Sequence, residues 1–292
     1  MAKTAAQAFD GFKAKLVLTE QQQELVKTRR ESTATYLATA FDSTSDMPLA
    51  RTKLIGSAAR SVIIRPIDDI DVMAVFENKD NIFEKYRFDS QTFLYRIRDA
   101  LSKYKVKVVG ARGQAVRLFY QSAPHVDIAP VFKWSGEGTG YGLPNGTGGW
   151  LTTNPDFHEE YMNEKNAALG YHLKPLVRML KRWNNVHSKR LKSWHLEVVA
   201  ANTFSSLGAN SRTASMNFFD WAQTRLYVND PAGHSGDLSS YLTTQGRADV
   251  IASLASAHGR AVKAVDAETA GNHEEAIRLW RIIYGDEFSA YG

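Results

Sequence analysis

Residues 54–76 read LIGSAARSVIIRPIDDIDVMAVF and decide the fold. The pair Gly56-Ser57 opens a short helix, and an apolar strand follows that carries Asp69 and Asp71. An apolar strand of this kind is normally buried, so two carboxylates within it are costly unless a cation meets them. Side chains two residues apart on a strand point to the same side, which predicts that Asp69 and Asp71 project together.

Two carboxylates at this spacing can chelate and bridge divalent metal ions, whose charge relieves the repulsion between them. Upstream, Gly56 lets the backbone approach a phosphate, Ser57 adds a hydroxyl, and the start of the helix offers free N–H groups to an anion. A phosphate cradle and metal-binding acids within one segment favour phosphoryl or nucleotidyl transfer. The alternative interpretation of the acids is a turn or strand-edge pair without a metal.

The composition limits the class of protein. A chain of 292 residues is long enough for one large domain or two lobes. It contains no cysteine, which excludes disulfides, thiolate zinc sites and cysteine nucleophiles. We find no signal-peptide pattern and no run of about 18 apolar residues, and therefore expect a cytoplasmic protein that does not enter a membrane. The net charge of +5 suits a polyanionic ligand such as a nucleoside triphosphate, and equally a solvated helix surface.

The first half of the chain is expected to form a mixed α/β lobe. A capping box at Thr19 and Gln22 predicts a long helix over about 20–41, and a second helix is expected to begin at Asp89 or Ser90. Asp127 lies in a later predicted strand, and a hairpin or meander would bring it beside the first two acids. The later strands are predicted over 105–109, 114–120 and 125–132.

The second half is expected to be helical. Residues 135–149 are rich in glycine without the spacing of a dinucleotide fingerprint, and we interpret them as a loop over the mouth of the site. Apolar residues then recur at helical spacing. We therefore predict two domains, 1–150 with the long N-terminal helix and 151–292. Helices are predicted from 155 onward and over 171–187, 193–206, 217–227, 247–265 and 272–285.

The ordered combination of Gly56-Ser57, Asp69-Ile-Asp71 and Asp127, followed by a helical lobe, resembles the DNA polymerase β-like nucleotidyltransferase superfamily. Within it the chain resembles the bacterial CD-NTases, the cyclic GMP–AMP synthase-like and oligoadenylate synthase-like branch of CBASS anti-phage systems. Further resemblance lies in four segments, 150–158, 176–184, 193–197 and 280–288. The resemblance implies an α+β fold in which the nucleotidyltransferase lobe packs against the helical lobe, with the active site in the cleft between them.

The resemblance also implies roles for individual residues. Asp69 and Asp71 would ligate two Mg²⁺ ions, for which Mn²⁺ can substitute, and Asp127 would ligate the ion that activates the attacking ribose hydroxyl. Gly56 and Ser57 would hold the β- and γ-phosphates of the triphosphate.

From the helical lobe, the resemblance implies that Lys181 and Ser193 reach the same phosphates and that Trp194 stacks on a base. Each has a simpler interpretation. Lys181 can be a solvated residue on an amphipathic helix, and Trp194 can belong to the core. Asp127, likewise, can be a structural hydrogen-bonding residue.

The function implied is the condensation of ATP, GTP or other NTPs into a cyclic di- or trinucleotide second messenger, with release of pyrophosphate. A downstream effector would respond to the product, and an E1-like ligase is a possible partner at the C-terminal Gly292. Without cysteine, the chain lacks the thiolate ligands of the zinc insertion used by the animal DNA sensor, so we expect no requirement for double-stranded DNA. Two alternatives stay open: synthesis of linear oligonucleotides or transfer to another acceptor, and a catalytically idle nucleotide-binding module.

Overall fold

The computed structural model describes residues 2–104, 108–134 and 140–292, and the chain divides into two compact units. We call them the sheet unit and the helical unit. The sheet unit comprises Thr19–Ser61 and Pro66–Glu159. The helical unit comprises Met1–Leu18, Val62–Arg65 and Glu160–Gly292. This division into one unit with a sheet and one of helices confirms the predicted α+β class.

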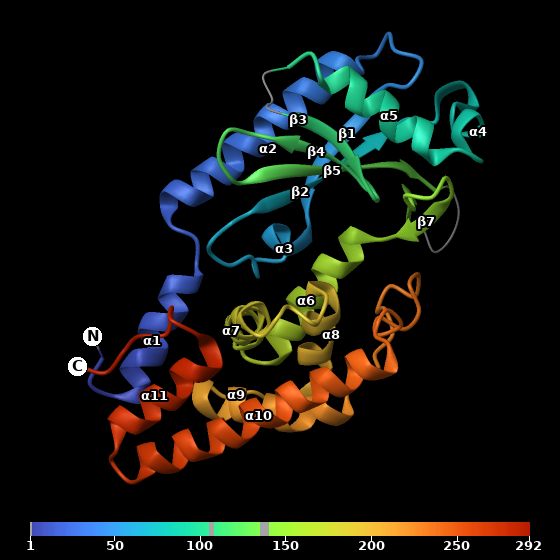
Figure 1. The fold of residues 1–292 in the computed structure, drawn as a ribbon. Helices are drawn as coiled ribbons and strands as arrows, with labels where there is room; N and C mark the ends of the chain where they lie inside the picture. The colour runs from blue at the N-terminus through green and yellow to red at the C-terminus, as the bar shows by residue number, and fades with distance from the viewer. Residues whose placement is uncertain (1, 105–107, 135–139) are drawn as a thin grey trace. The chain divides into compact units, whose positions relative to one another are not determined.

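The sheet unit is built on a seven-stranded mixed sheet in the order β1-β2-β5-β4-β3, with β6 pairing β5 and β7 pairing β6 (Figure 1). The two central strands, β2 and β5, are parallel, and the remaining pairs are antiparallel. The strands are β1 (Leu49–Ile55), β2 (Asp69–Phe76), β3 (Val108–Arg112), β4 (Ala115–Phe119), β5 (His125–Lys133), β6 (Tyr141–Pro144) and β7 (Trp150–Thr153).

The alternation of residues along β2 separates its two faces. Ile70, Val72 and Phe76 are buried on the face covered by α2 (Glu20–Ala40) and α5 (Ser90–Leu101) (Figure 1). The Phe76 ring meets Phe41 and Phe93 edge-on, at centroid distances of 5.1 and 5.6 Å. Because successive side chains alternate between faces, Asp69 and Asp71 project from the opposite face of the sheet.

The predicted helices of this unit are confirmed at their caps. The side chain of Thr19 accepts a hydrogen bond from the backbone N–H of Gln22, whose own side chain accepts one from the N–H of Thr19. Asp89 caps α5 by accepting from two N–H groups of its first turn. The short helix at Gly56 is present as α3 (Gly56–Ala59), and the unit also contains α4 (Phe83–Tyr86) and a 3₁₀ turn at Lys79–Asn81.

Two sequence expectations for the sheet unit need correction. The prediction did not include strand β1, and the glycine-rich segment is not a single loop. Its residues 141–144 form β6, which pairs with both β5 and β7. The parts of the predicted loop and of the predicted strand 105–109 that fall on 135–139 and 105–107 lie outside the described residues.

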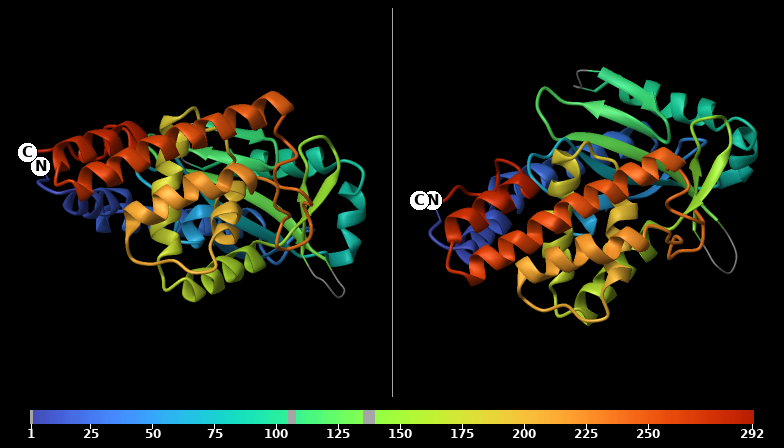
Figure 2. Two further views of the ribbon diagram at one scale, coloured as in Figure 1. Left: turned by 90° about the horizontal axis from the view of Figure 1, so that it is seen from below. Right: turned by 60° about the horizontal axis from the view of Figure 1, so that its bottom comes forward.

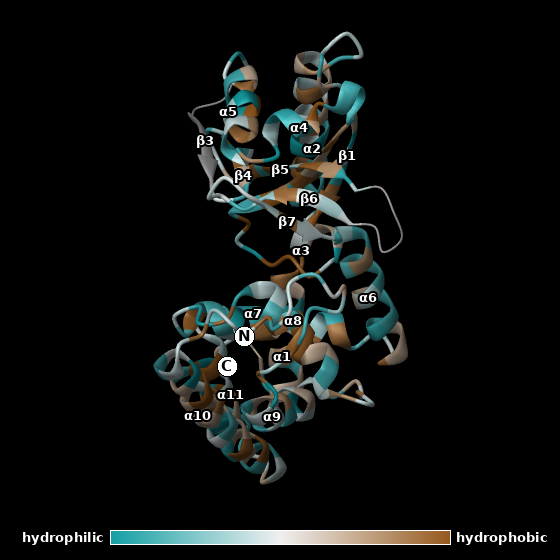
Figure 3. Ribbon diagram, turned by 90° about the vertical axis from the view of Figure 1, so that its right-hand side faces the viewer, coloured by the Kyte–Doolittle hydropathy of each residue, from teal (hydrophilic) through white to brown (hydrophobic). Residues whose placement is uncertain are grey.

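The helices of the helical unit carry both hydrophobic and hydrophilic residues (Figure 3). In α7 and α11 the buried residues recur at helical spacing, as in amphipathic helices, whereas α8 is buried on nearly all sides. The two C-terminal helices α10 and α11 lie side by side (Figure 2). Asn210 caps α9 and starts it six residues earlier than the predicted helix over 217–227, whose position was wrong. The helices are α1 (Ala5–Leu16), α6 (Pro155–Ala168, shared with the sheet unit), α7 (Leu173–Val186), α8 (Ser193–Thr203), α9 (Ser211–Trp221), a 3₁₀ turn (Ala222–Thr224), α10 (Thr244–Thr269) and α11 (His273–Tyr284).

Helix α1 was not predicted, and it belongs to the helical unit, not to the predicted domain 1–150. Phe9 packs edge-on against Trp280 and Phe288, with ring centroids 4.9 and 5.0 Å apart. Phe12 lies 4.8 Å from Tyr284. The five rings are buried together, so burial of two aromatic side chains assigns the N-terminus to this unit.

The other end of the sheet unit also differs from the predicted boundary at residue 150. The unit continues to Glu159 because the first turn of α6 is tied to the sheet. Lys53 on β1 contacts Asp156 at 2.6 Å and Glu159 at 2.9 Å, and the Tyr141 hydroxyl donates to Asp156 at 2.7 Å.

The two chain ends lie next to each other (Figure 1). Ala2 forms an isolated parallel bridge with Tyr291, and the N–H of Gly292 donates to the Ala2 carbonyl at 3.3 Å. Among the described residues, no helix combines the length and the apolar character needed to cross a membrane.

Candidate active site

Two adjacent strands place the predicted acids on one face of the sheet, and a third strand adds an arginine. Asp71 on β2 is paired with Asp127 on β5, and Asp127 is paired with Arg117 on β4. Side chains at paired positions of neighbouring strands project from the same face. Asp69 joins this face because it lies two residues before Asp71. The structure therefore brings the three predicted acids to one face. It does so by parallel pairing of β2 with β5, and not by the predicted hairpin or meander.

Arg117 is a member of the site that the sequence analysis did not identify. Its Nε and Nη2 donate to the two carboxylate oxygens of Asp127, each at 2.5 Å, and Nη2 also donates to Asp69 Oδ2 at 2.6 Å. The hydrogen bond with Asp127 raises the pKa of the guanidinium above its usual value, although burial opposes this shift. Arg117 is therefore a permanently charged partner of two acids.

The guanidinium also affects how the acids are arranged. Within the described ranges, no three histidine or acidic side chains lie together as a ready metal site. Arg117 occupies the position between Asp69 and Asp127 and bonds to both. The sequence signal that could have revealed it is an arginine between Val116 and Leu118, in a predicted strand next to the one that carries Asp127.

Gly56 lies against the acids. It follows Ile55, which is paired with Asp71 across β1 and β2. Its φ of +68° is in the left-handed region, and a Cβ at this position would lie 1.9 Å from Asp71 Oδ2. Only glycine can therefore occupy this position beside the carboxylate. Ser57 is the second residue of α3, where the sequence placed a hydroxyl for phosphate binding.

In the helical unit, Lys181 is buried and paired. Its Nζ lies 3.3 Å from Glu197 Oε1, and the two side chains are 9% and 0% exposed. The interpretation of Lys181 as a solvated surface residue is therefore wrong. Its predicted contact with phosphate stays a prediction, for which the ammonium group has three donors.

Ser193 and Trp194 begin helix α8, and the start of this helix is held from one side. The Tyr241 hydroxyl accepts from the backbone N–H of Lys192 at 2.8 Å and bonds to His195 Nδ1 at 3.0 Å. Burial lowers the pKa of His195, whose Nε2 donates to the Leu226 carbonyl at 2.7 Å. The N–H groups that begin a helix suit an anion, and a phosphate contact stays the prediction for Ser193. Trp194 is half-buried and packs against the core of the unit, edge-on to Tyr161.

The buried pair is expected to stabilise the helical unit. Replacing Glu197 by glutamine leaves the Lys181 ammonium without its buried counter-charge, which should cost about 3 kcal/mol of unfolding free energy. Urea unfolding of both proteins, followed by circular dichroism, measures the difference. The matched control is Glu275→Gln, which removes an exposed ion pair with Arg278 and should leave the midpoint almost unchanged. An unchanged midpoint for Glu197→Gln would contradict the prediction.

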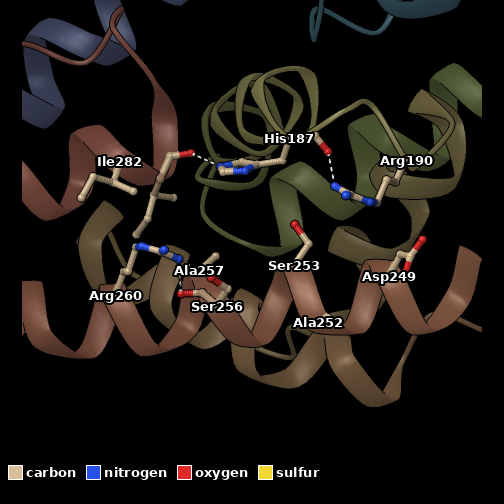
Figure 4. Close-up of a pocket in the computed structure, with 10 residues that line it drawn as sticks. His187, Arg190, Asp249, Ala252, Ser253, Ser256, Ala257, Arg260 and Ile282 are labelled. Carbon is tan, nitrogen blue, oxygen red and sulfur yellow. Dashed lines mark hydrogen bonds between the residues drawn. The ribbon is translucent and has the colours of Figure 1, made fainter.

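A separate hollow of about 250 Å³ lies in the helical unit, between α10 and the ends of α7 and α11 (Figure 4). Small residues of α10, including Ala252 and Ser253, form its floor, while His187 donates to the Ile283 carbonyl at its rim. None of the predicted site residues lines this hollow.

Comparison with known proteins identifies the family. Residues 3–166 match the model of the Second Messenger Oligonucleotide or Dinucleotide Synthetase domain. The whole chain is 27% identical to a Bacillus cereus (strain VD146) protein named as a probable cyclic nucleotide synthase, over 99% of that protein. It is 25% identical to the cyclic AMP-AMP-AMP synthase of Escherichia coli (strain MS 115-1), over 83% of this chain and 84% of that enzyme.

Solved structures show the same fold. The structure of E. coli MS115-1 CdnC with ATP superimposes with a TM-score of 0.80 at 18% identity, and the match covers 97% of this chain and 98% of CdnC. The family match spans more than half of the chain and includes all three acids. The chain therefore belongs to the second messenger oligonucleotide or dinucleotide synthetases, the CD-NTase branch of the polymerase β-like nucleotidyltransferases.

Proposed function

We propose that this nucleotidyltransferase condenses nucleoside triphosphates into a cyclic di- or trinucleotide in a magnesium-dependent reaction. The observation that carries the proposal is the row of Asp71, Asp127 and Arg117 across three strands, with Asp69 and Gly56 beside it. This arrangement puts carboxylates next to a helix start that suits a phosphate. The family match supplies the class of reaction.

The donor set fits magnesium. The three acids offer carboxylate oxygens, the ligands that hard divalent cations prefer, and the chain has no thiolate to favour a softer metal. The face already stabilises a positive charge, because the Arg117 guanidinium bonds to two of the acids. Three carboxylates and one guanidinium leave a net charge of −2, which attracts further cations.

The chemistry requires positioning and charge neutralisation and little covalent participation by the protein. Asp69, Asp71 and Asp127 would hold two Mg²⁺ ions, which supply charge stabilisation and activate the attacking hydroxyl. Gly56 and Ser57 would hold the β- and γ-phosphates. A ribose hydroxyl oxygen forms a bond to the α-phosphorus, the bond from that phosphorus to pyrophosphate breaks, and the hydroxyl proton is released. A further transfer of the same kind closes the ring.

From the helical unit, we propose that Lys181 and Ser193 bind the same phosphates and that Trp194 stacks on a base. The start of α8 supports this assignment, because the Tyr241 hydroxyl bonds to the backbone N–H of Lys192, next to Ser193, and to the side chain of His195. Glu197 would keep the Lys181 side chain extended in one direction.

ATP is the first substrate to test, because the E. coli relative is named a cyclic AMP-AMP-AMP synthase. We further propose that the product is a second messenger of anti-phage defence that activates a separate effector protein. No double-stranded DNA would be required. An E1-like ligase acting at Gly292 would have to separate the C-terminus from Ala2, with which it is hydrogen-bonded.

The product analysis tests the proposal. The protein is incubated with ATP alone and with all four NTPs, with Mg²⁺, Mn²⁺ or EDTA, and the products are treated with phosphatase and resolved by mass. We expect metal-dependent, phosphatase-resistant cyclic products. Linear products with free terminal phosphates would contradict ring closure. Binding of NTPs without any product would show a catalytically idle module.

A further inference from the structure

We propose that Arg117 is a positioning residue of the metal site, which fixes the orientation of Asp127 and Asp69 for metal binding. The inference rests on the proposed function, because it assumes that these acids hold the metal ions. It assigns a role to a residue outside the acids themselves, and the role depends on the shape of the guanidinium as well as on its charge.

Arg117 and Asp127 are joined at two points. Arg117 Nε and Nη2 donate to Asp127 Oδ1 and Oδ2, so two parallel hydrogen bonds fix the plane of the carboxylate. Each carboxylate oxygen has a second lone pair, which remains for a metal ion. A third bond, from Nη2 to Asp69 Oδ2, ties the first acid to the same group. One guanidinium therefore sets the orientation of two acids that come from different strands.

Arg117 is itself held in place. Its side chain is only 10% exposed, against 38% for Asp69 and 22% for Asp127. Its backbone is paired directly with Asp127 in the antiparallel ladder of β4 and β5. A buried side chain on a rigid strand is the kind of support that aligns metal ligands, and losing such support typically weakens metal binding about 10- to 100-fold.

Two other roles make different predictions. A residue that only balances charge would be replaceable by lysine, which keeps the charge and lacks the planar fork. A residue that competes with the metal for the acids would, when replaced by a neutral side chain, let the metal bind more tightly. We favour positioning because the guanidinium donates two parallel hydrogen bonds, one to each oxygen of the Asp127 carboxylate. Neutralising the charge of Asp127 does not by itself require this arrangement.

The experiment measures Mn²⁺ binding directly, by electron paramagnetic resonance of the free ion during titration of metal-free protein. The variants are Arg117→Lys and Arg117→Gln. We expect both to bind Mn²⁺ about tenfold more weakly or worse than the unaltered protein, because neither can form the fork. The matched control is Arg98→Gln, which removes one positive charge from a partly exposed position of α5 in the same unit. It should bind Mn²⁺ as the unaltered protein does.

The outcomes separate this inference from the proposed function. The metal site is supported if the unaltered protein binds Mn²⁺ and the double variant Asp69→Asn with Asp71→Asn does not. If the unaltered protein binds no Mn²⁺, both proposals are overturned. If the unaltered protein binds Mn²⁺ and Arg117→Lys binds it equally well, the positioning role alone is overturned. Tighter binding by Arg117→Gln also overturns it. Circular dichroism checks the fold of each variant, and if Arg117→Gln fails to fold, Arg117→Lys decides.

Discussion

Replacement of both Asp69 and Asp71 by asparagine is expected to abolish nucleotide consumption, with a loss of at least about 10³-fold. The two carboxylates are the proposed ligands of both metal ions, which contribute several kcal/mol of charge stabilisation to phosphoryl transfer. Asparagine keeps the size of each side chain and removes its negative charge. Release of pyrophosphate from ATP, measured with saturating Mg²⁺, gives the rate.

The fold should survive this double change. The Asp69 side chain is 38% exposed, and asparagine at both positions removes repulsion between like charges. Circular dichroism and thermal unfolding provide the check. The control is Asp68→Asn at the neighbouring acid, which we predict to point away from the pair and which should keep its activity. Retained metal-dependent turnover in the double variant would refute the assignment of the acids.

The change of Gly56 to alanine is expected to reduce activity by at least about 100-fold, although it adds a single methyl group. The new Cβ would lie 1.9 Å from Asp71 Oδ2, so either the carboxylate or the turn before α3 must move. A displacement of about 1 Å at a reacting centre can cost this much in rate. The backbone is also strained, because alanine disfavours a φ of +68°. Pyrophosphate release measures the effect.

Two other glycines of the chain serve as controls. They separate the two possible causes of the activity loss, the collision with Asp71 and the strain of the backbone. Gly113 has a similar φ of +64° with open space around a Cβ, so Gly113→Ala reproduces the strain without the collision. Gly259 lies within α10, also in open space, where alanine should stabilise the helix. Activity losses that are equal for Gly56→Ala and Gly113→Ala would show that strain, and not the contact with Asp71, is responsible.

Local patterns predicted much of the secondary structure. The capping box at Thr19 and the Asp89 cap each depend on a few neighbouring residues, and both form as expected. Helix α9 was misplaced because its signal, Asn210, lies before the segment in which apolar residues recur. Strand β1 was missed because its exposed and half-buried residues do not alternate in polarity.

The acids of the site could be predicted because each is a charged residue in an otherwise apolar strand, where a carboxylate is unexpected. Asp69 and Asp71 stand in an otherwise apolar strand, and Asp127 lies between Val126 and Ile128 in another. Arg117 breaks the same local pattern, between Val116 and Leu118, but the sequence does not say which side chain it meets. Its importance arises only from its register opposite Asp127, which the pairing of β4 with β5 sets.

The sequence by itself determined the α+β class and the family, and it predicted the three acids and the glycine-serine helix start, because each depends on residues close together or on their order along the chain. Only the tertiary structure decided that Arg117 joins Asp127 to Asp69, that Lys181 is buried on Glu197 and that α1 packs on α11. These contacts join residues that lie far apart in sequence or on different elements. Their partners are chosen by strand register and by the burial of apolar surface, which no local pattern encodes.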